Sequence, residues 1–142
     1  KKGLPFYNDG STGYVSVSDV VGTMILLMNN DVHNERYVLV ADNCKHRDVL
    51  AWMAVGYGKK PPFIHVSNAL MLLASGILEL VGKVAGFKPL IDTASAKTSL
   101  SQKHYSSEKF STQFPAFKFA SIEETVKSVC SFDIEYSAKS TV

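Results

Sequence analysis

Two residues with complementary chemistry, Tyr105 and Lys109, stand four positions apart in the segment HYSSEKF. On a helix, residues at positions i and i+4 share one face. A lysine ammonium beside a tyrosine hydroxyl lowers the pKa of that hydroxyl, so the tyrosine can act as a general acid or base. The pair is therefore the first candidate for an active site in this sequence.

The composition is that of an ordinary globular chain. Its 142 residues suit one domain or a part of one, and 46% hydrophobic with 20% charged residues excludes a disordered segment. The net charge of +2 comes from scattered lysines rather than a basic stripe, so we expect no nucleic-acid partner. Cys44 and Cys130 lack metal-ligand spacing, and we expect two free thiols in a reducing cytoplasm.

Other side chains that carry chemistry are better explained by structural roles. The four histidines are far apart and form no metal-ligand cluster, so no metal site is expected at His33, His46, His65 or His104. Asp19 stands directly before an apolar helical pattern, which favours an N-terminal cap over a buried reactive carboxylate. Trp52 lies near the apolar side of a predicted helix and is expected in the core or an interface.

Strands and helices alternate in the first half of the chain. Short strands at 4–7 and 14–17 flank Asn8-Asp9-Gly10, and Asp-Gly favours a tight turn, so a loose hairpin is predicted. A helix capped by Ser18 or Asp19 ends at Asn29-Asn30, and its apolar positions recur every three to four residues, at Val20, Val21, Met24, Ile25, Leu27 and Met28. The segment ERYVLV at 35–40 has the continuous apolar run of a strand buried on both faces of a parallel sheet.

The remaining elements are mostly helical. A second helix opens at Asn43 or Cys44 and runs to about Val55, with inward residues Val49, Leu50, Met53 and Ala54. A brief extended piece at 63–66 precedes a helix that Ser67 caps and that reaches about Val84. Thr93 caps a short helix. The capping box at 121–124 opens the last helix, whose inner face contains Ile122, Val126, Val129 and Cys130.

The apolar run ALMLLASGIL at 69–78 raises the question of a membrane span. A spanning helix needs about 20 apolar residues, and this run is far shorter. Asn68, Glu79 and Lys83 bracket it. We therefore expect a buried or partner-facing helix and no membrane segment.

Six blocks, in this order, resemble the C-terminal half of an extended short-chain dehydrogenase/reductase of the NAD-dependent epimerase/dehydratase superfamily. They are GYVSVSDVV at 13–21, ERYVLVADN at 35–43, the helix with RDVL at 47–50, GKKPP at 58–62, YSSEK at 105–109 and SIEET at 121–125. The resemblance runs from about Gly3 to Phe132. Each block alone is moderately specific, and their order carries the weight.

The resemblance implies that Tyr105 and Lys109 are structural. In that family the catalytic Tyr-x-x-x-Lys lies upstream of the glycine-tyrosine-valine block, in the middle of the Rossmann domain, whereas Tyr105 follows that block. A second, non-catalytic tyrosine-to-lysine segment occurs at this later place in relatives, and Tyr105 to Phe114 matches it. The sequence STQFP at 111–115 departs from the glycine-containing turn of relatives.

A nicotinamide cofactor also needs a glycine-rich turn from strand to helix, where the pyrophosphate binds at the helix N-terminus. Gly10 and Gly13 provide only two glycines and precede a strand, so no cofactor-binding residue is expected in this chain. The cofactor of the parent enzyme, NAD or NADP, would be held by an N-terminal Rossmann domain that the chain lacks. We expect the chain alone to be catalytically inert.

The resemblance places the opening loop at the substrate cleft, with ordinary loop contacts as the alternative. The expected substrate-lining residues are Phe6, Tyr7, Asn8 and Tyr14. Thr12 and Gly13 stand where sugar-nucleotide epimerases commonly carry a diphosphate-binding arginine. This difference and the apolar helix at 69–78 resemble the dihydroflavonol-reductase and hydroxysteroid-dehydrogenase-like branch.

The sequence is thus interpreted as a mostly helical α/β chain with a few short strands, one of them part of a Rossmann-type parallel sheet. Residues 1–136 form the substrate-binding part of an NAD(P)-dependent oxidoreductase, epimerase or dehydratase, and 137–142 a frayed tail. Its partner is a small molecule with a carbonyl or secondary alcohol, and homo-oligomers are expected because the strand at 35–40 would have unpaired edges. The alternative is an autonomous helical protein-interaction or membrane-associated module without catalysis.

Overall fold

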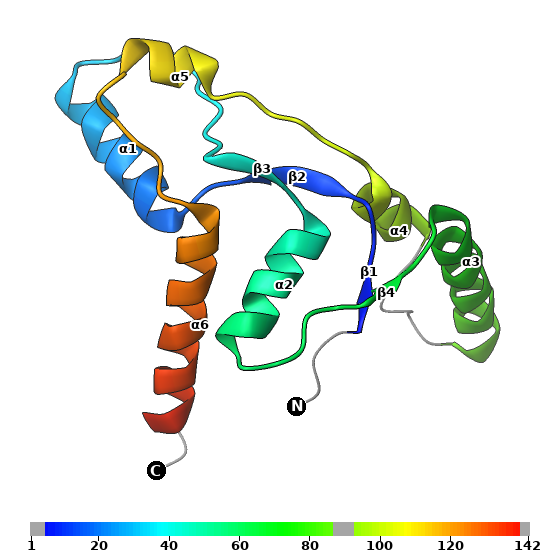
Figure 1. Cartoon of the computed structure of the whole chain (residues 1–142). Helices are drawn as coiled ribbons and strands as arrows, with labels where there is room; N and C mark the ends of the chain where they lie inside the picture. Colours follow the sequence, from blue (N-terminus) through cyan, green and yellow to red (C-terminus); the bar gives the residue numbers. More distant parts are fainter. Residues whose placement is uncertain (1–4, 87–92, 140–142) are drawn as a thin grey trace.

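The computed structural model describes residues 5–86 and 93–139, so the expectations for 1–4 and 140–142 lie outside the described residues. The described chain is a mostly helical α/β fold with a few short strands, which confirms the expected fold class (Figure 1). Its elements in chain order are β1 (Phe6–Tyr7), β2 (Ser11–Tyr14), α1 (Val17–Asn29), β3 (Asp42–Lys45), α2 (His46–Gly56), β4 (Ile64–His65), α3 (Asn68–Ala85), α4 (Thr93–Leu100), α5 (Glu108–Gln113) and α6 (Ile122–Lys139).

The strands form two small sheets in the middle of the fold. β1 pairs in parallel with β4, and β2 pairs antiparallel with β3. The expected hairpin is therefore wrong, since β1 and β2 each pair with a strand far along the chain. The turn between them packs closely against α4. An added Cβ at Gly10 would lie only 1.9 Å from the backbone oxygen of Ser99.

The segment 35–40 is not a strand in the structure, which corrects the prediction of a buried strand in a parallel sheet. It is extended, and Val38 is 54% exposed. At its end, the backbone N–H of Val40 donates to the Ser107 hydroxyl at 3.2 Å, and that hydroxyl donates to the Val40 carbonyl. The apolar run indicated a tendency to be buried, but among the described residues no strand pairs with 35–40, although Val40 packs against Gly13 of β2.

α1 has the expected length, and the side chains that it buries are polar. Ser16 caps it by accepting the N–H of Ser18 at 3.1 Å, so the expected caps at Ser18 and Asp19 are wrong. Asp19 is buried and accepts the backbone N–H of Ala120 at 2.9 Å. Thr23 is also buried, whereas four apolar side chains of the helical pattern are between 49% and 81% exposed, namely Val21, Met24, Ile25 and Met28.

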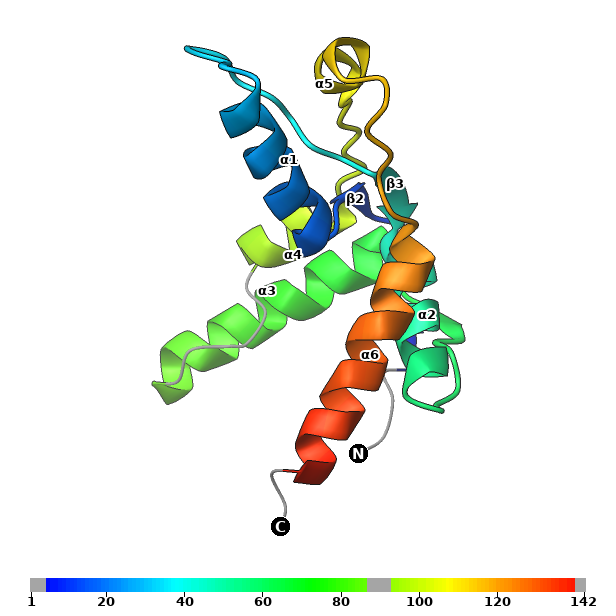
Figure 2. The same cartoon turned by 90° about the vertical axis from the view of Figure 1, so that its left-hand side faces the viewer.

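α2 and α6 pack side by side (Figures 1 and 2). The close approach depends on Gly56, where an added Cβ would lie 2.8 Å from Cβ of Cys130. β3 occupies the positions where α2 was expected to begin, and α2 starts at His46. Both cysteines are buried free thiols, as predicted. Val129 is 60% exposed, so its expected place on the inner face of α6 is wrong.

Two clusters form the core. The first contains Cys44, Val49 and Ile122, with Tyr14, Ala41, Trp52 and Val126 packed against them, so Trp52 contacts the core as expected. Met53, expected to face inward, is 40% exposed. The second is aromatic: Phe110 is 1% exposed and its ring lies 5.2–5.8 Å from those of Tyr37, Phe114, Phe117 and Phe119. These contacts fix α5 to the segment 35–40 and to the segment that follows α5.

α3 matches its prediction closely. The Ser67 hydroxyl accepts the N–H of Leu70, and Gly86 ends the helix in the left-handed conformation. Thr93 is the first residue of α4 rather than its cap, and its hydroxyl donates to Glu79 of α3 at 2.8 Å. Across residues 5–86 and 93–139, no helix is long and apolar enough to cross a membrane. α6 continues to Lys139, so residues 137–139 are helical instead of frayed.

Candidate functional site

A cavity of about 1320 Å³, here called the main cavity, lies between the β1–β2 segment and the helices α2, α3 and α4. Figure 1 shows α2 and α6 on one side of the short strands and α3 with α4 on the other. The walls from α2 and α3 are largely apolar, with Val49, Leu50, Met53, Leu70, Met71 and Leu78. The wall from α4 and the chain after it carries hydroxyls, with Ser95, Thr98, Ser99 and Ser101. Apolar walls with a few convergent polar groups are typical of small-molecule sites.

The four residues that the sequence analysis placed at a substrate cleft all line the main cavity: Phe6, Tyr7, Asn8 and Tyr14. They come together because β1 and β2 follow one another across the cavity wall, each held by a different sheet. Phe6 is 53% exposed. Their role in substrate binding stays a prediction, while their shared location is a property of the fold.

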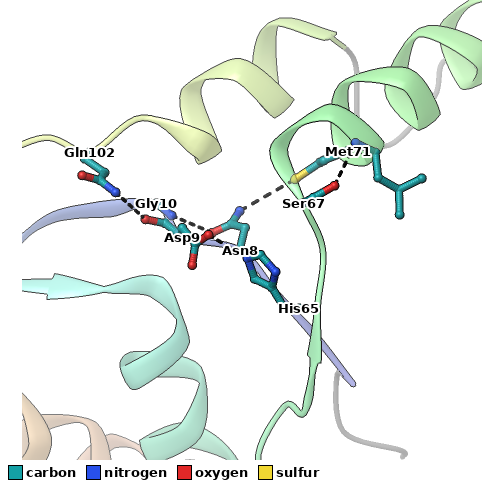
Figure 3. A network of polar contacts seen from close by, with 8 residues as sticks. Asn8, Asp9, Gly10, His65, Ser67, Met71 and Gln102 are labelled. Atoms are coloured by element: carbon teal, nitrogen blue, oxygen red, sulfur yellow. Dashed lines mark hydrogen bonds and ion pairs between the residues drawn. The ribbon is translucent and has the colours of Figure 1, made fainter.

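Asn8 connects three elements at the cavity wall (Figure 3). Its side-chain N–H₂ donates to the Ser99 hydroxyl of α4 at 2.6 Å and lies 3.8 Å from the Met71 sulfur of α3. Its side-chain oxygen accepts the N–H of Gly10 at 3.2 Å, which closes the turn between β1 and β2. Asn8 therefore serves as a support of the wall, with its amide groups engaged by the protein.

A second polar group lies beside this turn, where β4 ends (Figure 3). The carboxylate of Asp9 contacts Nε2 of His65 at 2.7 Å, and both side chains are about half exposed. The Tyr7 ring lies 5.4 Å from the His65 ring and 4.9 Å from the Arg47 guanidinium. The Tyr7 ring is thus held between a histidine and an arginine, which fixes this part of the cavity wall.

Tyr14 and His46 meet at the cavity wall, with 3.0 Å between the Tyr14 hydroxyl and Nδ1 of His46. Burial is the main cause that raises the pKa of Tyr14 above its ordinary value, and the nearby Cys44 adds to it. Tyr14 is therefore an uncharged phenol near neutral pH. Sequence analysis treated His46 as an ordinary histidine, and since it is 32 positions from Tyr14, no local spacing could have linked the two.

Tyr105 and Lys109 do not share a helical face, because α5 begins only at Glu108. The backbone of Tyr105 exchanges two hydrogen bonds of 2.9 Å with the Asn43 side chain. The ammonium of Lys109 contacts the Glu35 carboxylate and the Arg36 carbonyl. Neither residue lines the main cavity.

Nothing in the described ranges brings three metal-ligand side chains close enough together to hold a metal ion. His33 contacts Asp31 at 2.8 Å and His65 contacts Asp9, both in exposed pairs. These histidines are therefore engaged by single carboxylates.

No protein-family model matches this chain, and no curated protein matches it. Among solved structures, the chain is similar to the crystal structure of gox2253, with a TM-score of 0.71 and 18% sequence identity. The similarity covers 94% of this chain and 40% of the gox2253 chain. At this identity it concerns the fold, and the chain spans about two fifths of that larger protein.

Proposed function

We propose that this chain is the substrate-binding part of an NAD(P)-dependent oxidoreductase, epimerase or dehydratase that acts on a carbonyl or secondary alcohol. The observation that carries the proposal is the main cavity, which unites Phe6, Tyr7, Asn8 and Tyr14 with apolar walls and few charged groups. His46 and Lys103 are the titratable or charged side chains that line it besides the two tyrosines. Such a site favours an uncharged, mostly apolar molecule over a sugar nucleotide.

Two surface features support a role within a larger protein. The apolar face of α1 is exposed, with Val17 at 79% and Met28 at 81%. Residues 35–40 pair with no strand among the described residues. A further part of the protein would cover both, and the similarity to two fifths of a larger chain agrees with this arrangement.

The residues described here do not fit a nicotinamide dinucleotide. Its pyrophosphate needs glycines that let it approach a helix N-terminus. Gly10 is instead buried against the backbone oxygen of Ser99, and Gly13 packs against Val40 and Tyr105. The cofactor would therefore be bound outside the described residues, and this chain's contribution is to bind and orient the substrate and to exclude water from it.

The test uses the full-length protein and a substitution that fills the main cavity. Ala74 lines the cavity from α3, whereas Leu73 is 63% exposed on the same helix and does not line it. With apolar ring ketones such as 2-tetralone, Ala74→Trp is expected to lower kcat/KM at least tenfold while the Kd for NADPH stays unchanged. Leu73→Trp is the matched control and should retain activity.

Three results would contradict the proposal. The first is that the full-length protein neither binds NADH or NADPH nor reduces any ketone in the panel. The second is that Ala74→Trp changes the Kd for NADPH as much as kcat/KM. The third is a preference for UDP-glucose over apolar ketones, which would contradict the substrate class.

One observation favours a second candidate, a helical interaction module. α3 exposes a row of apolar side chains at the spacing of one helical face, with Leu70, Leu73, Ile77 and Leu80 each at least 54% exposed. The absence of dinucleotide binding in the full-length protein, together with loss of a protein partner in Leu73→Glu, would favour this module.

A further inference from the structure

We propose that Tyr14 and His46 together form the group that recognises one oxygen atom, a hydroxyl or a carbonyl, of the ligand in the main cavity. This inference rests on the proposed function, in that the cavity must bind a small molecule. It goes further by assigning specificity to two residues and by requiring a single oxygen on an otherwise apolar ring system.

Three other polar side chains of the cavity wall already make hydrogen bonds within the protein. The Asn8 amide donates to Ser99, and the Ser75 hydroxyl donates to the carbonyl of Leu72 at 2.9 Å. The Ser101 hydroxyl donates to the carbonyl of Thr98 at 2.7 Å. These groups satisfy the backbone and fix the wall, which leaves them less capacity for a ligand.

The Tyr14–His46 hydrogen bond leaves both side chains able to form a further hydrogen bond. A phenol has one donor and two acceptor sites, and a neutral imidazole has one donor and one acceptor nitrogen. If the Tyr14 hydroxyl donates to Nδ1, its oxygen still accepts a hydrogen bond from a ligand hydroxyl. If Nδ1 carries the proton and donates, the Tyr14 hydroxyl can donate to a ligand carbonyl. The pair therefore suits both an alcohol and a ketone.

The side chains of Tyr14 and His46 are both held in place before any ligand binds. Tyr14 packs against the cluster of Cys44, Val49 and Ile122. His46 is the first residue of α2, and its backbone N–H donates to the carbonyl of Gly10 at 2.9 Å. A group held by two neighbouring elements loses little freedom when it binds a ligand. Burial also keeps Tyr14 in its uncharged form, since its pKa is raised.

Much of the remaining cavity wall comes from α2 and α3 and is apolar, including Leu50, Met71 and Leu78. Lys103 is a charged side chain of the lining, but the apolar part of the wall would not compensate a charged ligand for its lost hydration. The cavity of about 1320 Å³ has room for a fused-ring molecule. The ligand class is therefore an uncharged ring compound with one hydroxyl or carbonyl group placed to reach the pair.

The experiment compares two probes of nearly equal shape, 2-naphthol and 2-methylnaphthalene, on the full-length protein. Dissociation constants are measured by following backbone amide signals in NMR titrations, which also report whether each variant is folded. The quantity of interest is the Kd of 2-methylnaphthalene divided by that of 2-naphthol. In Tyr14→Phe, which keeps the ring, this ratio is expected to fall about five- to tenfold because one hydrogen bond is lost.

Two further variants sharpen the result. His46→Ala should lower the ratio to a similar extent, because Tyr14 loses the partner that orients its hydroxyl. Tyr136→Phe is the matched control, because Tyr136 is 65% exposed on α6 and does not line the main cavity, and it should change the ratio less than twofold. If both probes bind and Tyr14→Phe leaves the ratio unchanged, the inference is overturned while the proposed function stands. If neither probe binds in the wild type, the inference is overturned, and the proposed function is decided by the ketone and NADPH measurements.

Discussion

The ammonium of Lys109 contacts the carboxylate of Glu35, 74 positions earlier in the chain, and lies 5.0 Å above the ring of Tyr37. The hydrogen bond from Lys109 is the largest cause that lowers the pKa of Glu35, and the same bond raises the pKa of Lys109. Lys109 therefore ties α5 to the extended segment 35–40. Tyr105, which precedes α5, makes its own contacts with Asn43.

This arrangement predicts that Tyr105→Phe leaves the turnover of the full-length protein within about twofold of wild type. The ring stays in place beside Gly13, and only a hydroxyl that does not line the main cavity is removed. Steady-state kcat measurements on the purified variant test this. A thousandfold loss of kcat would mean that the Tyr105–Lys109 pair is catalytic after all. Lys109→Met is the companion variant and should lower stability while leaving kcat unchanged.

The turn between β1 and β2 yields a prediction about stability. Gly10→Ala is expected to destabilise the protein by about 1–3 kcal/mol, because the new Cβ would lie 1.9 Å from the Ser99 carbonyl oxygen and the backbone must move. Gly76→Ala is the matched control inside α3, where nothing lies within 4 Å of the new Cβ. It should stabilise the helix by about 0.5–1 kcal/mol. Urea unfolding of both variants measures the two effects, and an unchanged midpoint in Gly10→Ala would contradict the close packing.

Local sequence signals predicted the existence of α1, α2, α3, α4 and α6, although the caps expected for α1 and α4 and the start expected for α2 were wrong. Ser67 and Gly86 bound α3 as expected. The orientation of α1 was not predictable in this way. Asp19 accepts the N–H of Ala120, 101 positions away, and that contact rather than the apolar spacing decides which face is buried. Periodicity identifies an apolar face, but tertiary partners decide whether that face is covered.

The candidate site shows the same difference between local and long-range contacts. Phe6, Tyr7, Asn8 and Tyr14 lie close together in sequence, so a loop placed at the cavity brings all four with it. The hairpin failed because the Asp-Gly signal predicts a turn but not which strands pair beyond it. His46 and the walls from α3 and α4 come from distant segments, whose approach depends on the whole fold. The neighbouring residues of this cavity wall could thus be named from the sequence, their role in substrate binding stays a prediction, and the long-range part of the wall could not be named.

The contact between α2 and α6 predicts a dependence of stability on pH. The Tyr57 hydroxyl donates to the Asp133 carboxylate at 2.8 Å, and this bond is the main cause that raises the pKa of Tyr57 to about 12 from an ordinary value of 10.0. Because the pKa of Tyr57 is higher in the folded state, the stabilisation from its bond to Asp133 is fully present below pH 10. It is lost as the pH rises through about 12.

Tyr57→Phe should therefore be less stable than wild type at pH 7, and the difference should shrink between pH 10 and 12. Urea unfolding followed by circular dichroism at pH 7, 9 and 11 gives the comparison. Tyr136→Phe is a suitable control because Tyr136 is 65% exposed on α6 and stacks on Phe132. A difference for Tyr57→Phe that stays constant from pH 7 to pH 11 would mean that the bond to Asp133 is not its source.

The exposed face of α1 predicts self-association of the 142-residue chain. Met24, Ile25 and Met28 are 57%, 54% and 81% exposed, and exposed apolar patches of this kind are typical of surfaces that another surface covers. The extended segment 35–40 adds backbone groups that a second copy can pair with by strand exchange. Light scattering at increasing protein concentration should detect dimers or larger species.

Met28→Glu places a charge on the most exposed of these positions and should shift the chain toward monomer without unfolding it. Val129→Glu is the matched control, since Val129 is 60% exposed on α6, away from the α1 face. Association that Val129→Glu abolishes and Met28→Glu leaves intact would assign the contact to α6. A monodisperse wild-type monomer at high concentration would contradict self-association altogether, and it would mean that the α1 face tolerates water without a covering surface.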